Sequence, residues 1–357
     1  MDFLSSKTYS NSLHQTCVAF QTELSKLNDK DVMITGATGM IGGCFVDLLT
    51  YWNLFFGGKI HLYAVSRNRE SAEIRFSNYF RFDFFSYLEQ DVCCSLSGSF
   101  PQKIDYIVHA ASNGDPVSFA KYPIDTLLSN VLGVKLLFDY GISAHFTRFL
   151  YVSSGEVYGK PNQAYDDFVE GYCGPIDLAS PRSCYPEGKR AAEVLCQSYI
   201  SQYRVNCVIA RPCHIFGPTM TKRDTRAVSE FFSRAAAGLD IELKSSGLIE
   251  RSHCYVLDAI SALLCVLTKG ECGMTYNIAD PFYQMTIRAF AEKIAKAGNV
   301  GISYKAPDNL EQKGYSKIQR SVLSNTMLLK LGWNPMERKV TAIEETLQIL
   351  HEGKEAW

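Results

Sequence analysis

The chain has 357 residues, a length that fits either two domains or one α/β domain with a smaller appendage. Apolar residues make up 46% and charged residues 20% of the sequence, a balance typical of a packed globular protein. The formal net charge of −1 excludes a broad basic field that would attract nucleic acid or anionic lipid, but it allows a local basic pocket for a small anionic ligand.

The first 212 residues alternate between short apolar runs and amphipathic stretches. Residues 8–27 predict an amphipathic helix packed outside the main domain. The apolar runs that predict β-strands are residues 31–36, 59–66, 85–92, 104–112, 148–154 and 205–212. Helices are expected at residues 40–52, 69–82, 124–141 and 186–203. This alternation predicts an α/β fold, a Rossmann-like doubly wound parallel sheet that helices cover on both faces.

A glycine-rich segment directly follows the first predicted strand. The run TGATGMIGG places Gly36, Gly39 and Gly42 in the order GxxGxxG at the start of a predicted helix. Gly36 would allow a tight turn, and Gly42 would let helix and strand pack closely. Gly39 would let backbone N–H groups approach a pyrophosphate at the positive end of the helix. The segment predicts a dinucleotide site; the alternative is a tight strand-to-helix turn without a ligand.

The ends of the second and third strands bear on which dinucleotide binds. An acidic residue after the second strand would bind the ribose 2′-hydroxyl of NAD, but this chain has Ser66, Arg67 and Asn68 there. Because a guanidinium pairs with a 2′-phosphate, Arg67 favours NADP, unless it only faces solvent. Asp91 and Val92 end the third strand, where they could contact the adenine. Asp91 could equally cap a turn.

After Pro212, predicted strands and helices alternate less regularly, and loops are expected at residues 217–226 and 303–317. We interpret residues 1–30 as an N-terminal extension and residues 31–212 as the NAD(P)-binding Rossmann domain. Residues 213–357 are expected to form mainly a smaller substrate-binding lobe that returns in part to the sheet. Such a lobe would lie over the carboxyl ends of the strands, where ligands bind in open α/β sheets.

The run SCYPEGKRAAE, residues 183–193, contains a tyrosine and a lysine four positions apart. On a helix this spacing places Tyr185 and Lys189 on one face. Alone, the motif is more typical of a surface tyrosine and a surface lysine. A free tyrosine has a pKa of about 10, but a lysine ammonium and a cationic nicotinamide nearby would both favour the phenolate. Tyr185 could then act as a base, with Ser154 at the end of the fifth strand orienting the substrate hydroxyl.

The cysteine pattern and the N-terminal segment indicate a reducing, cytoplasmic location. The twelve cysteines are scattered, with Cys93 and Cys94 as the only adjacent pair and no CxxC, so neither a disulfide framework nor a metal site is expected. Cys196, Cys207 and Cys265 lie in apolar runs, where thiols behave as small hydrophobes. The first 30 residues lack the apolar core of a signal peptide, and no run of 18 apolar residues could span a membrane.

The motifs together resemble those of the extended short-chain dehydrogenase/reductase family, the NAD-dependent epimerases and dehydratases that modify nucleotide sugars. The matching segments, which span residues 31 to about 350, are TGATGMIG (35–42), HAAS (109–112), YVSSGEVYG (151–159), Tyr185 with Lys189, ARPCHIFGP (210–218) and RSHCYVLD (251–258). The resemblance implies tightly bound NAD or NADP, a nucleotide-sugar substrate and a homodimer formed through the helices at 124–141 and 186–203.

Within that family the sequence is most similar to the UDP-glucuronate decarboxylases. YPIDTLLSNVLGV (122–134) resembles their P-x-x-T-L-x-x-N-x-x-G segment, and residues 183–193 resemble their tyrosine-helix motif. GPTMTKRDTRAVSEFF (217–232) resembles their loop with Asp-x-Arg-x-Val-Ser-x-Phe. Four features depart from the family. Ser154 stands where Thr is usual, Gly155 where the 4,6-dehydratases carry an Asp acid, and His214 where relatives carry an Asn. The end of the second strand also lacks the usual acidic residue.

The resemblance assigns roles residue by residue. The catalytic set is Ser154, Glu156, Tyr185 and Lys189. The substrate-binding set is Ser154, Gly155, Glu156, His214, Arg226 and Arg251. The cofactor-binding set is Gly36, Thr38, Gly39, Met40, Ile41, Gly42, Ser66, Arg67, Asn68, Asp91, Val92, Ala110, Ala111, Ser112, Asn130, Tyr185 and Lys189.

Two of these residues, Glu156 and Arg251, could have structural roles instead of the assigned ones. Glu156 could position a substrate acid group or handle a proton, but it could also cap the turn before Tyr158. Arg251 could hold a carboxylate or a diphosphate by paired hydrogen bonds, or form a structural ion pair with Asp258 or Glu250.

The roles of three further side chains can also be interpreted structurally. Arg226 could bind phosphate or be solvated. His214 could replace the Asn of relatives as a donor or be a satisfied cleft histidine. His109 is expected to be a core residue at a strand end.

The expected reaction begins with oxidation at C4 of a hexose. If C5 carries a carboxylate, the resulting ketone is β to it and CO2 leaves readily, so decarboxylation of a UDP-uronic acid is the leading prediction. Return of hydride to the other face would give 4-epimerisation, and loss of water would give 4,6-dehydration, which the missing acid at Gly155 disfavours. A net reductase and a non-catalytic dinucleotide-binding sensor are the rival classes.

Overall fold

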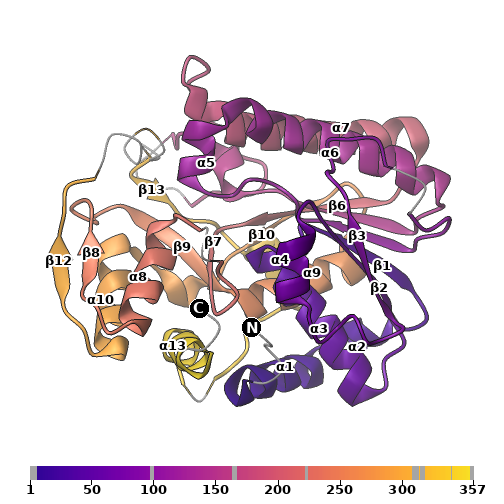
Figure 1. Cartoon of the computed structure of the whole chain (residues 1–357). Helices are drawn as coiled ribbons and strands as arrows, with labels where there is room; N and C mark the ends of the chain where they lie inside the picture. Colours follow the sequence, from indigo (N-terminus) through magenta and orange to yellow (C-terminus); the bar gives the residue numbers. More distant parts are fainter. Residues whose placement is uncertain are drawn as a thin grey trace.

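The fold is built around a seven-stranded parallel sheet (Figure 1). The computed structural model describes residues 6–96, 100–162, 167–221, 224–307, 313, 318–338 and 340–353. The strands of the sheet are β1 Asp31–Thr35, β2 His61–Ser66, β3 Phe85–Glu89, β4 Tyr106–His109, β5 Arg148–Val152, β6 Cys207–Pro212 and β10 Thr275–Ile278. The spatial order is β10-β6-β5-β4-β1-β2-β3. This order reverses between β1 and β4, as in doubly wound folds, and it confirms the predicted fold class.

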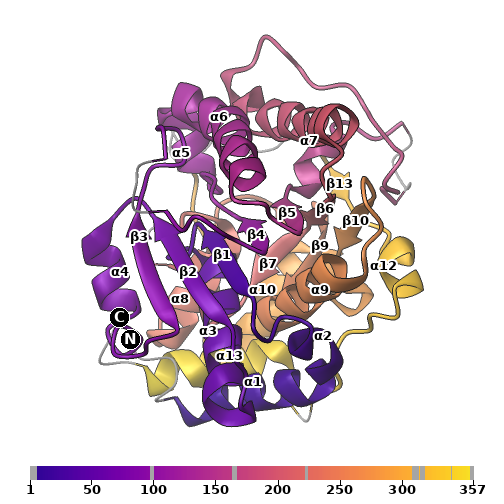
Figure 2. The ribbon, with the colours of Figure 1, turned by 90° about the vertical axis from the view of Figure 1, so that its right-hand side faces the viewer.

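Helices cover both faces of the sheet, as Figure 2 shows. The four main ones are α3 Met40–Phe56, α9 Val256–Lys269, α6 Pro123–Ser143 and α7 Cys184–Tyr203. Alternate side chains of β1 point to opposite faces. Val32 and Ile34 join one apolar cluster with residues of α3 and α9, whereas Met33 joins a second cluster with residues of α6 and α7. The strands are apolar on both sides because both faces are buried.

Two predicted elements are shorter than the sequence indicated. The helix expected at residues 69–82 is α4 Arg69–Arg75, and the chain then runs through turns in which Phe76 and Tyr79 are buried. These aromatic rings pack against Phe85 at the start of β3, and that contact is incompatible with a continued helix. The strand expected at 104–112 ends at His109, after which the chain leaves the sheet. Short helices α5 Pro116–Lys121 and η1 Gly155–Tyr158 follow the ends of β4 and β5, and η2 Pro181–Ser183 directly precedes α7.

The N-terminal extension is part of the main core rather than packed outside it. It forms two helices, α1 Lys7–Ala19 and α2 Gln21–Ser25, in place of the single helix predicted at 8–27. The side chains of Tyr9, Leu13 and Cys17 are fully buried in the cluster that contains α3 and α9. The Tyr9 hydroxyl donates a 2.9 Å hydrogen bond to the buried Asp47 carboxylate on α3.

The C-terminal lobe combines small sheets with helices beside the carboxyl ends of the main strands. Its strands are β7 His214–Phe216, β8 Ile241–Leu243, β9 Glu250–Tyr255, β11 Gln284–Thr286, β12 Ile302–Tyr304 and β13 Arg320–Ser321. Its helices are α8 Ala227–Ala236, η3 Pro281–Tyr283, α10 Ile287–Gly298, α12 Thr326–Lys330 and α13 Ala342–Glu352. The chain returns from the lobe to add β10 to the edge of the main sheet. Much of the predicted loop at 303–317 lies outside the described residues.

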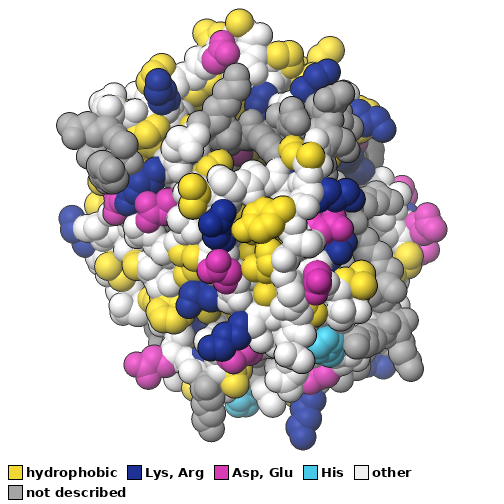
Figure 3. All heavy atoms as spheres, turned by 90° about the vertical axis from the view of Figure 1, so that its left-hand side faces the viewer, with side chains coloured by type: hydrophobic (Ala, Val, Ile, Leu, Met, Phe, Trp, Pro, Cys, Tyr) yellow, Lys and Arg dark blue, Asp and Glu magenta, His cyan; other side chains and the backbone are white. Residues whose placement is uncertain are grey.

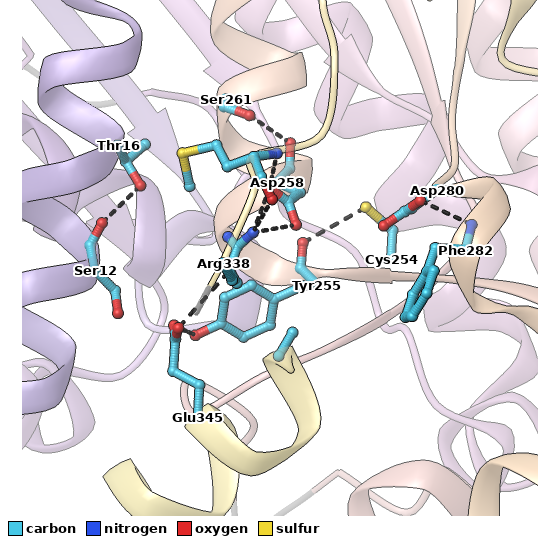
Figure 4. A network of polar contacts seen from close by, with 12 residues as sticks. Ser12, Thr16, Cys254, Tyr255, Asp258, Ser261, Asp280, Phe282, Arg338 and Glu345 are labelled. Carbon is cyan, nitrogen blue, oxygen red and sulfur yellow. Dashed lines mark hydrogen bonds and ion pairs between the residues drawn. The ribbon is translucent and has the colours of Figure 1, made fainter. Parts of the chain in front are cut away.

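A buried polar network ties the end of the chain to the lobe (Figure 4). Arg338 pairs with Asp258 at 3.0 Å, and its guanidinium lies over the ring of Tyr255, 4.7 Å from the centroid. The Tyr255 hydroxyl donates to Glu345 of α13 at 2.6 Å. Burial raises the pKa of Asp258 to about 6, although the arginine acts against that rise. The Asp258 carboxylate is therefore held in a buried ion pair with Arg338.

Charges of both signs are intermixed on the face of the lobe that Figure 3 shows. This surface has no large single-sign field, which agrees with the formal net charge of −1. Among the described residues, no helix combines the length and apolar character that crossing a membrane requires.

Candidate active site

The glycine segment forms a tight turn against the loop after β4. Gly36 has a φ of +70°, and a Cβ there would lie 2.8 Å from backbone atoms of Ala110 and Ala111. A Cβ at Gly42 would lie 2.3 Å from the Gly36 carbonyl oxygen, so the first turn of α3 rests directly on the strand end. Gly39 precedes α3 with extended backbone and no side chain that caps the helix. This leaves backbone N–H groups at the helix start available to an anion.

The lobe also reaches this helix start. Thr219 donates to the Met40 carbonyl oxygen at 3.0 Å, and the Arg226 guanidinium contacts the Met40 sulfur at 3.6 Å. Arg226 is not simply solvated, because its Nε donates to Asp224 at 2.9 Å and its Nη1 donates to the Ile215 carbonyl at 3.1 Å. Burial alone would raise the pKa of Asp224, but the guanidinium holds that pKa below its ordinary value. Arg226 is therefore a fixed cation between the glycine turn and the lobe.

The residues after β2 show which groups border the expected ribose site. The Asn68 side chain accepts a 2.6 Å hydrogen bond from the Ser71 N–H and so caps α4. Arg67 is exposed beside it. Ser66 is buried at the end of β2, where its hydroxyl lies 3.2 Å from the Tyr87 hydroxyl. Asn68 thus has a structural role, whereas Arg67 is free to meet a ligand from solvent.

The expected cofactor-binding residues after β3 and β4 make contacts of their own. Asp91 accepts a 2.9 Å hydrogen bond from the Cys93 N–H, so it caps a turn as the alternative interpretation held. Val92 is buried next to Gly133 of α6. The Ser112 hydroxyl donates to the backbone carbonyl of Asn113 at 3.1 Å.

Tyr185, Lys189 and Ser154 meet at the ends of β5 and α7, and none of them is a freely exposed surface side chain. The Tyr185 ring stacks on Phe119 with centroids 4.4 Å apart. Burial raises the pKa of Tyr185 to about 12, and the nearby Ser154 side chain acts to lower that pKa. Lys189 donates to the Val152 carbonyl at 2.8 Å, and its Nζ lies 5.8 Å from the centroid of the Tyr185 ring. Burial lowers the pKa of Lys189 to about 7.

A set of buried polar groups surrounds Lys189. Its Nζ lies 4.9 Å from the centroid of the Tyr151 ring. Asn130 packs on the first turns of α7 at Gly188, next to Lys189. Among the described residues, Asn130 Oδ1, Tyr151 Oη and His109 Nε2 are buried without a hydrogen-bond partner. Because a glycine-lined turn and a buried lysine adjoin these groups, the residues present fit a dinucleotide with a polar ribose.

His109 has the structural role that the sequence indicated. Its Nδ1 lies 2.7 Å from the Thr35 hydroxyl, which joins β4 to β1. Burial, with a contribution from the Lys189 ammonium, lowers the pKa of His109 to about 3. The ring is therefore neutral, and it is part of the sheet core.

Glu156 does not cap a turn with its side chain. Its carboxylate pairs with Arg182, whose Nη2 lies 2.7 Å from Oε2 and 2.8 Å from Oε1. The Arg182 guanidinium also lies over the Phe119 ring, 4.7 Å from the centroid. Sequence reasoning missed Arg182 and Phe119. Arg182 precedes Tyr185 by three positions, and that helical spacing could have indicated its place in the site.

Arg251 is buried on β9 without the ion pairs that were its structural alternative. Its guanidinium donates to the backbone carbonyls of Glu250 at 2.8 Å and Ile318 at 2.5 Å. The Glu250 carboxylate is bound instead by Arg320 at 2.8 Å. Within the described residues, no carboxylate lies within 4 Å of the Arg251 guanidinium. Burial lowers the pKa of Arg251 to about 10, and Glu156 acts against that change.

His214 and Gly155 complete the wall on the lobe side. His214 is half-buried on β7, beside His253 of β9 with ring centroids 5.8 Å apart. Burial, followed by the charges of Arg251 and its neighbours, lowers the pKa of His214 well below its ordinary value, so the ring is neutral. A Cβ at Gly155 would lie 3.0 Å from the side chain of Leu323. An apolar side chain therefore occupies the space that a side chain at position 155 would need.

None of these groups forms a metal centre: among the described residues, no cluster of three or more His, Cys, Asp or Glu side chains is arranged to hold a metal ion. The fold and the glycine turn instead define a Rossmann-type protein of the extended short-chain dehydrogenase/reductase class.

The sequence narrows this class to one family. A sequence model of the NAD dependent epimerase/dehydratase family matches residues 32–279, and the chain belongs to that family. UDP-glucuronic acid decarboxylase 1 of Xenopus tropicalis is 28% identical over 335 residues, which cover 91% of this chain and 72% of that protein. UDP-glucuronic acid decarboxylase 3 of Arabidopsis thaliana is 28% identical over 85% of this chain and 84% of its own length. The predicted similarity to these decarboxylases is confirmed.

Solved structures share the fold at lower identity. An epimerase from Methanothermobacter thermautotrophicus superposes with a TM-score of 0.80 at 20% identity and covers 95% of this chain and 97% of its own. The UDP-glucuronic acid 4-epimerase of Bacillus cereus, solved with UDP-glucuronic acid and NAD, has a TM-score of 0.74 at 18% identity over 92% of this chain and all of its own. At such identities the comparison shows a common fold.

Proposed function

We propose that this chain is an NAD(P)-dependent nucleotide-sugar enzyme that decarboxylates a UDP-uronic acid, UDP-glucuronate, through a 4-keto intermediate. The observation that carries the proposal is Arg251, a buried guanidinium that faces the candidate site without a carboxylate partner in the described chain. A buried cation is costly unless an anion pairs with it, so this position favours an anionic substrate. The relatives named UDP-glucuronic acid decarboxylase support the choice of uronate.

The geometry supports a division of roles in the first step. In this proposal the Tyr185 phenolate takes the proton of the sugar C4 hydroxyl, and Ser154, whose side chain adjoins Tyr185, orients that hydroxyl. The bound cofactor supplies hydride chemistry by accepting hydride from C4 and later returning it. The Lys189 ammonium favours the phenolate, because a cation beside a phenol lowers the pKa of that phenol.

The second step is loss of CO2 from the 4-keto acid. The C5–C6 bond breaks, its electron pair enters an enolate that spans C4 and C5, and a proton then adds to C5. In this proposal Arg251 binds a negative group of the substrate, and the Glu156–Arg182 pair borders the reacting carbons. Return of hydride to C4, with the proton from Tyr185, gives a UDP-pentose and leaves the cofactor unchanged overall.

The cofactor is a dinucleotide, and its exact form stays a prediction. The family is NAD-dependent, and the glycine turn has the shape that a pyrophosphate needs. The exposed Arg67 and the lack of an acidic residue directly after β2 support NADP. Tight retention is supported by Thr219 and Arg226, which contact the start of α3 from the lobe.

The residues of the candidate site support the two alternative reactions to different extents. Epimerisation at C4 requires no leaving group and uses the same Tyr185 and Ser154, so it is the second candidate. Dehydration requires an acid near C6, and the Leu323 side chain beside Gly155 leaves little space for one. A non-catalytic dinucleotide sensor would have no need of the Ser154, Tyr185 and Lys189 arrangement.

Assembly and location are also proposals. On α6 and α7 the apolar side chains of Ile124 and Val194 are 71% and 65% exposed, which supports a homodimer formed through these helices. All twelve cysteines are free, in agreement with a reducing cytoplasm.

The test is mass spectrometry of products after separate incubations with UDP-glucuronate, UDP-glucose and UDP-N-acetylglucosamine, each with NAD or NADP. Loss of CO2 from the uronate alone is the expected result. An unchanged mass with inverted C4 would instead establish epimerisation. No turnover of any donor would contradict the proposed enzyme class.

A further inference from the structure

A buried aromatic side chain on α5 contacts the candidate catalytic tyrosine, and the proposed chemistry does not use it. Phe119 is 2% exposed, yet among the described residues it belongs to none of the apolar clusters that form the core. Its ring instead stacks on Tyr185, with centroids 4.4 Å apart and ring planes inclined by 20°. Aromatic pairs favour stacked arrangements at such distances. Phe119 is therefore buried by the candidate site rather than by the hydrophobic core.

The same ring also contacts the ion pair of the site. The Arg182 guanidinium lies over Phe119, 4.7 Å from the ring centroid, and Arg182 Nη2 lies 2.7 Å from Oε2 of Glu156. A guanidinium over an aromatic face is attracted to that face. Phe119 thus connects the Glu156–Arg182 pair to the ring of Tyr185.

Contacts with two other segments hold α5 in place. Asp115 caps the start of the helix, because its carboxylate accepts from the Ser118 N–H at 3.0 Å and from the Ser118 hydroxyl at 2.6 Å. Thr225, just before α8, donates to the same carboxylate at 2.8 Å. Further along α5, the Phe119 carbonyl accepts from the Cys184 thiol at 3.8 Å. A ring on this helix therefore has a fixed position relative to the start of α7.

Tyr185 is a residue that needs such a contact. Its side chain is half-buried at the second position of α7, and rotation about its χ1 bond allows several staggered orientations. Lys189 borders the ring only at a distance, with its Nζ 5.8 Å from the centroid and bound to the Val152 carbonyl. A base must lie within hydrogen-bond reach of the proton that it removes. The stack on Phe119 is the contact that fixes the plane of this phenol.

We propose that Phe119 is a positioning residue of the candidate active site. Its ring, held by α5 and contacted by Arg182, keeps the Tyr185 phenol in the orientation that reaches the substrate hydroxyl. Phe119 acts through Tyr185 and does not touch the reacting atoms. The inference rests on the proposed function, because it assumes that Tyr185 works as a base.

The first test is steady-state kinetics with UDP-glucuronate. Phe119→Leu keeps an apolar side chain but removes the stacked ring, and we expect kcat to fall by about tenfold, the upper end of what an aromatic pair contributes. KM should stay nearly unchanged, because the lost contact serves the base and not substrate binding. Phe119→Tyr retains the ring and should restore kcat. Phe138→Leu is the matched control, because it removes a ring stacked on Tyr199 of the same helix α7, with centroids 4.5 Å apart.

The second test needs no sugar nucleotide. Carbon-13 is placed at Cζ of the tyrosines in the dinucleotide-bound full chain, and the Tyr185 resonance is assigned by its loss in Tyr185→Phe. We expect one sharp Tyr185 resonance in the unaltered chain and in Phe138→Leu. In Phe119→Leu we expect broadened or additional resonances, because the ring then adopts more than one orientation. Cζ lies on the ring axis, so flips of the ring do not contribute.

These outcomes separate positioning from packing. If Phe119 only packs α5 against α7, Phe119→Leu would lower the melting temperature, while its kcat and its Tyr185 resonance would match those of Phe138→Leu. That result would overturn the proposal, and so would a loss of kcat that Phe119→Tyr does not restore. If Phe119→Leu does not fold, Phe119→Met takes its place, because the flexible methionine side chain fills irregular gaps. If the unaltered chain does not turn over UDP-glucuronate, the proposed function fails, and the resonance decides whether Phe119 orders Tyr185.

Discussion

Glu156 and Arg182 form an ion pair at the mouth of the candidate site, with Nη2 of the arginine 2.7 Å from Oε2 of the glutamate. The pair joins η1, which follows β5, to the segment that begins α7. The pair therefore fixes the glutamate relative to Tyr185.

Replacement of Arg182 should impair turnover more than folding. In Arg182→Met the Glu156 carboxylate loses its partner, and the arginine charge that lowers the pKa of Tyr185 is also lost. We expect kcat on UDP-glucuronate to fall by about 10- to 100-fold, at or below the lower end of the roughly 10²- to 10⁴-fold that a positioned acid–base group contributes. Steady-state kinetics measures this, with Arg69→Met as the control, because Arg69 forms an exposed pair with Glu73. Unchanged kinetics in Arg182→Met would contradict the role assigned to the pair.

Lys189 should make the stability of the cofactor-free chain depend on pH. Burial lowers its pKa in the folded state to about 7, below the ordinary value of 10.5. Between these two values the unfolded chain binds the proton and the folded chain does not, so the free energy of unfolding rises with pH. Relative to Lys189→Met, the slope should be about 1.4 kcal/mol per pH unit above pH 7. Urea unfolding at several pH values measures it, and parallel curves for the two proteins would refute the shifted pKa.

Arg67 should decide between the two dinucleotides. If its guanidinium pairs with the 2′-phosphate, Arg67→Ala should weaken NADP binding by about tenfold or more and leave NAD binding nearly unchanged. Calorimetric titration of both cofactors into both proteins gives the four dissociation constants. Equal effects on NAD and NADP, or a clear preference of the unaltered chain for NAD, would show that Arg67 only faces solvent.

The N-terminal extension should contribute to stability through its buried tyrosine. Tyr9→Phe removes the hydrogen bond to the Asp47 carboxylate, which then keeps Tyr79 and Arg75 as partners. Loss of a buried hydrogen bond to a charged group should lower the free energy of unfolding by about 1.5–3 kcal/mol. Val18→Ala, on the exposed side of α1, is the control and should change it far less. Chemical denaturation measures both, and equal losses would contradict an integral role for α1.

Features that depend on residues close together in the chain could be predicted from the sequence. The GxxGxxG turn, the Tyr185–Lys189 spacing and the alternation of strands and helices are local patterns, and each predicted the correct element. Contacts between distant segments were not accessible in this way. The packing of Leu323 against Gly155 and of Tyr9 against Asp47 depends on how remote segments meet. Arg182 and Phe119 were missed because their roles depend on partners, Glu156 and Tyr185, that lie elsewhere in the sequence.

The most direct test of the proposed function combines UDP-glucuronate with a change at Arg251. The unaltered chain with bound dinucleotide should release CO2 and form a UDP-pentose without net reduction of the cofactor. Arg251→Met, which removes the buried cation, should lower kcat/KM for the uronate by about 100-fold or more, because a desolvated charge pair is lost. Mass spectrometry and CO2 release measure both proteins. No CO2 from the unaltered chain, or equal release from Arg251→Met, would contradict the proposal that this arginine marks the site of a uronic acid decarboxylase.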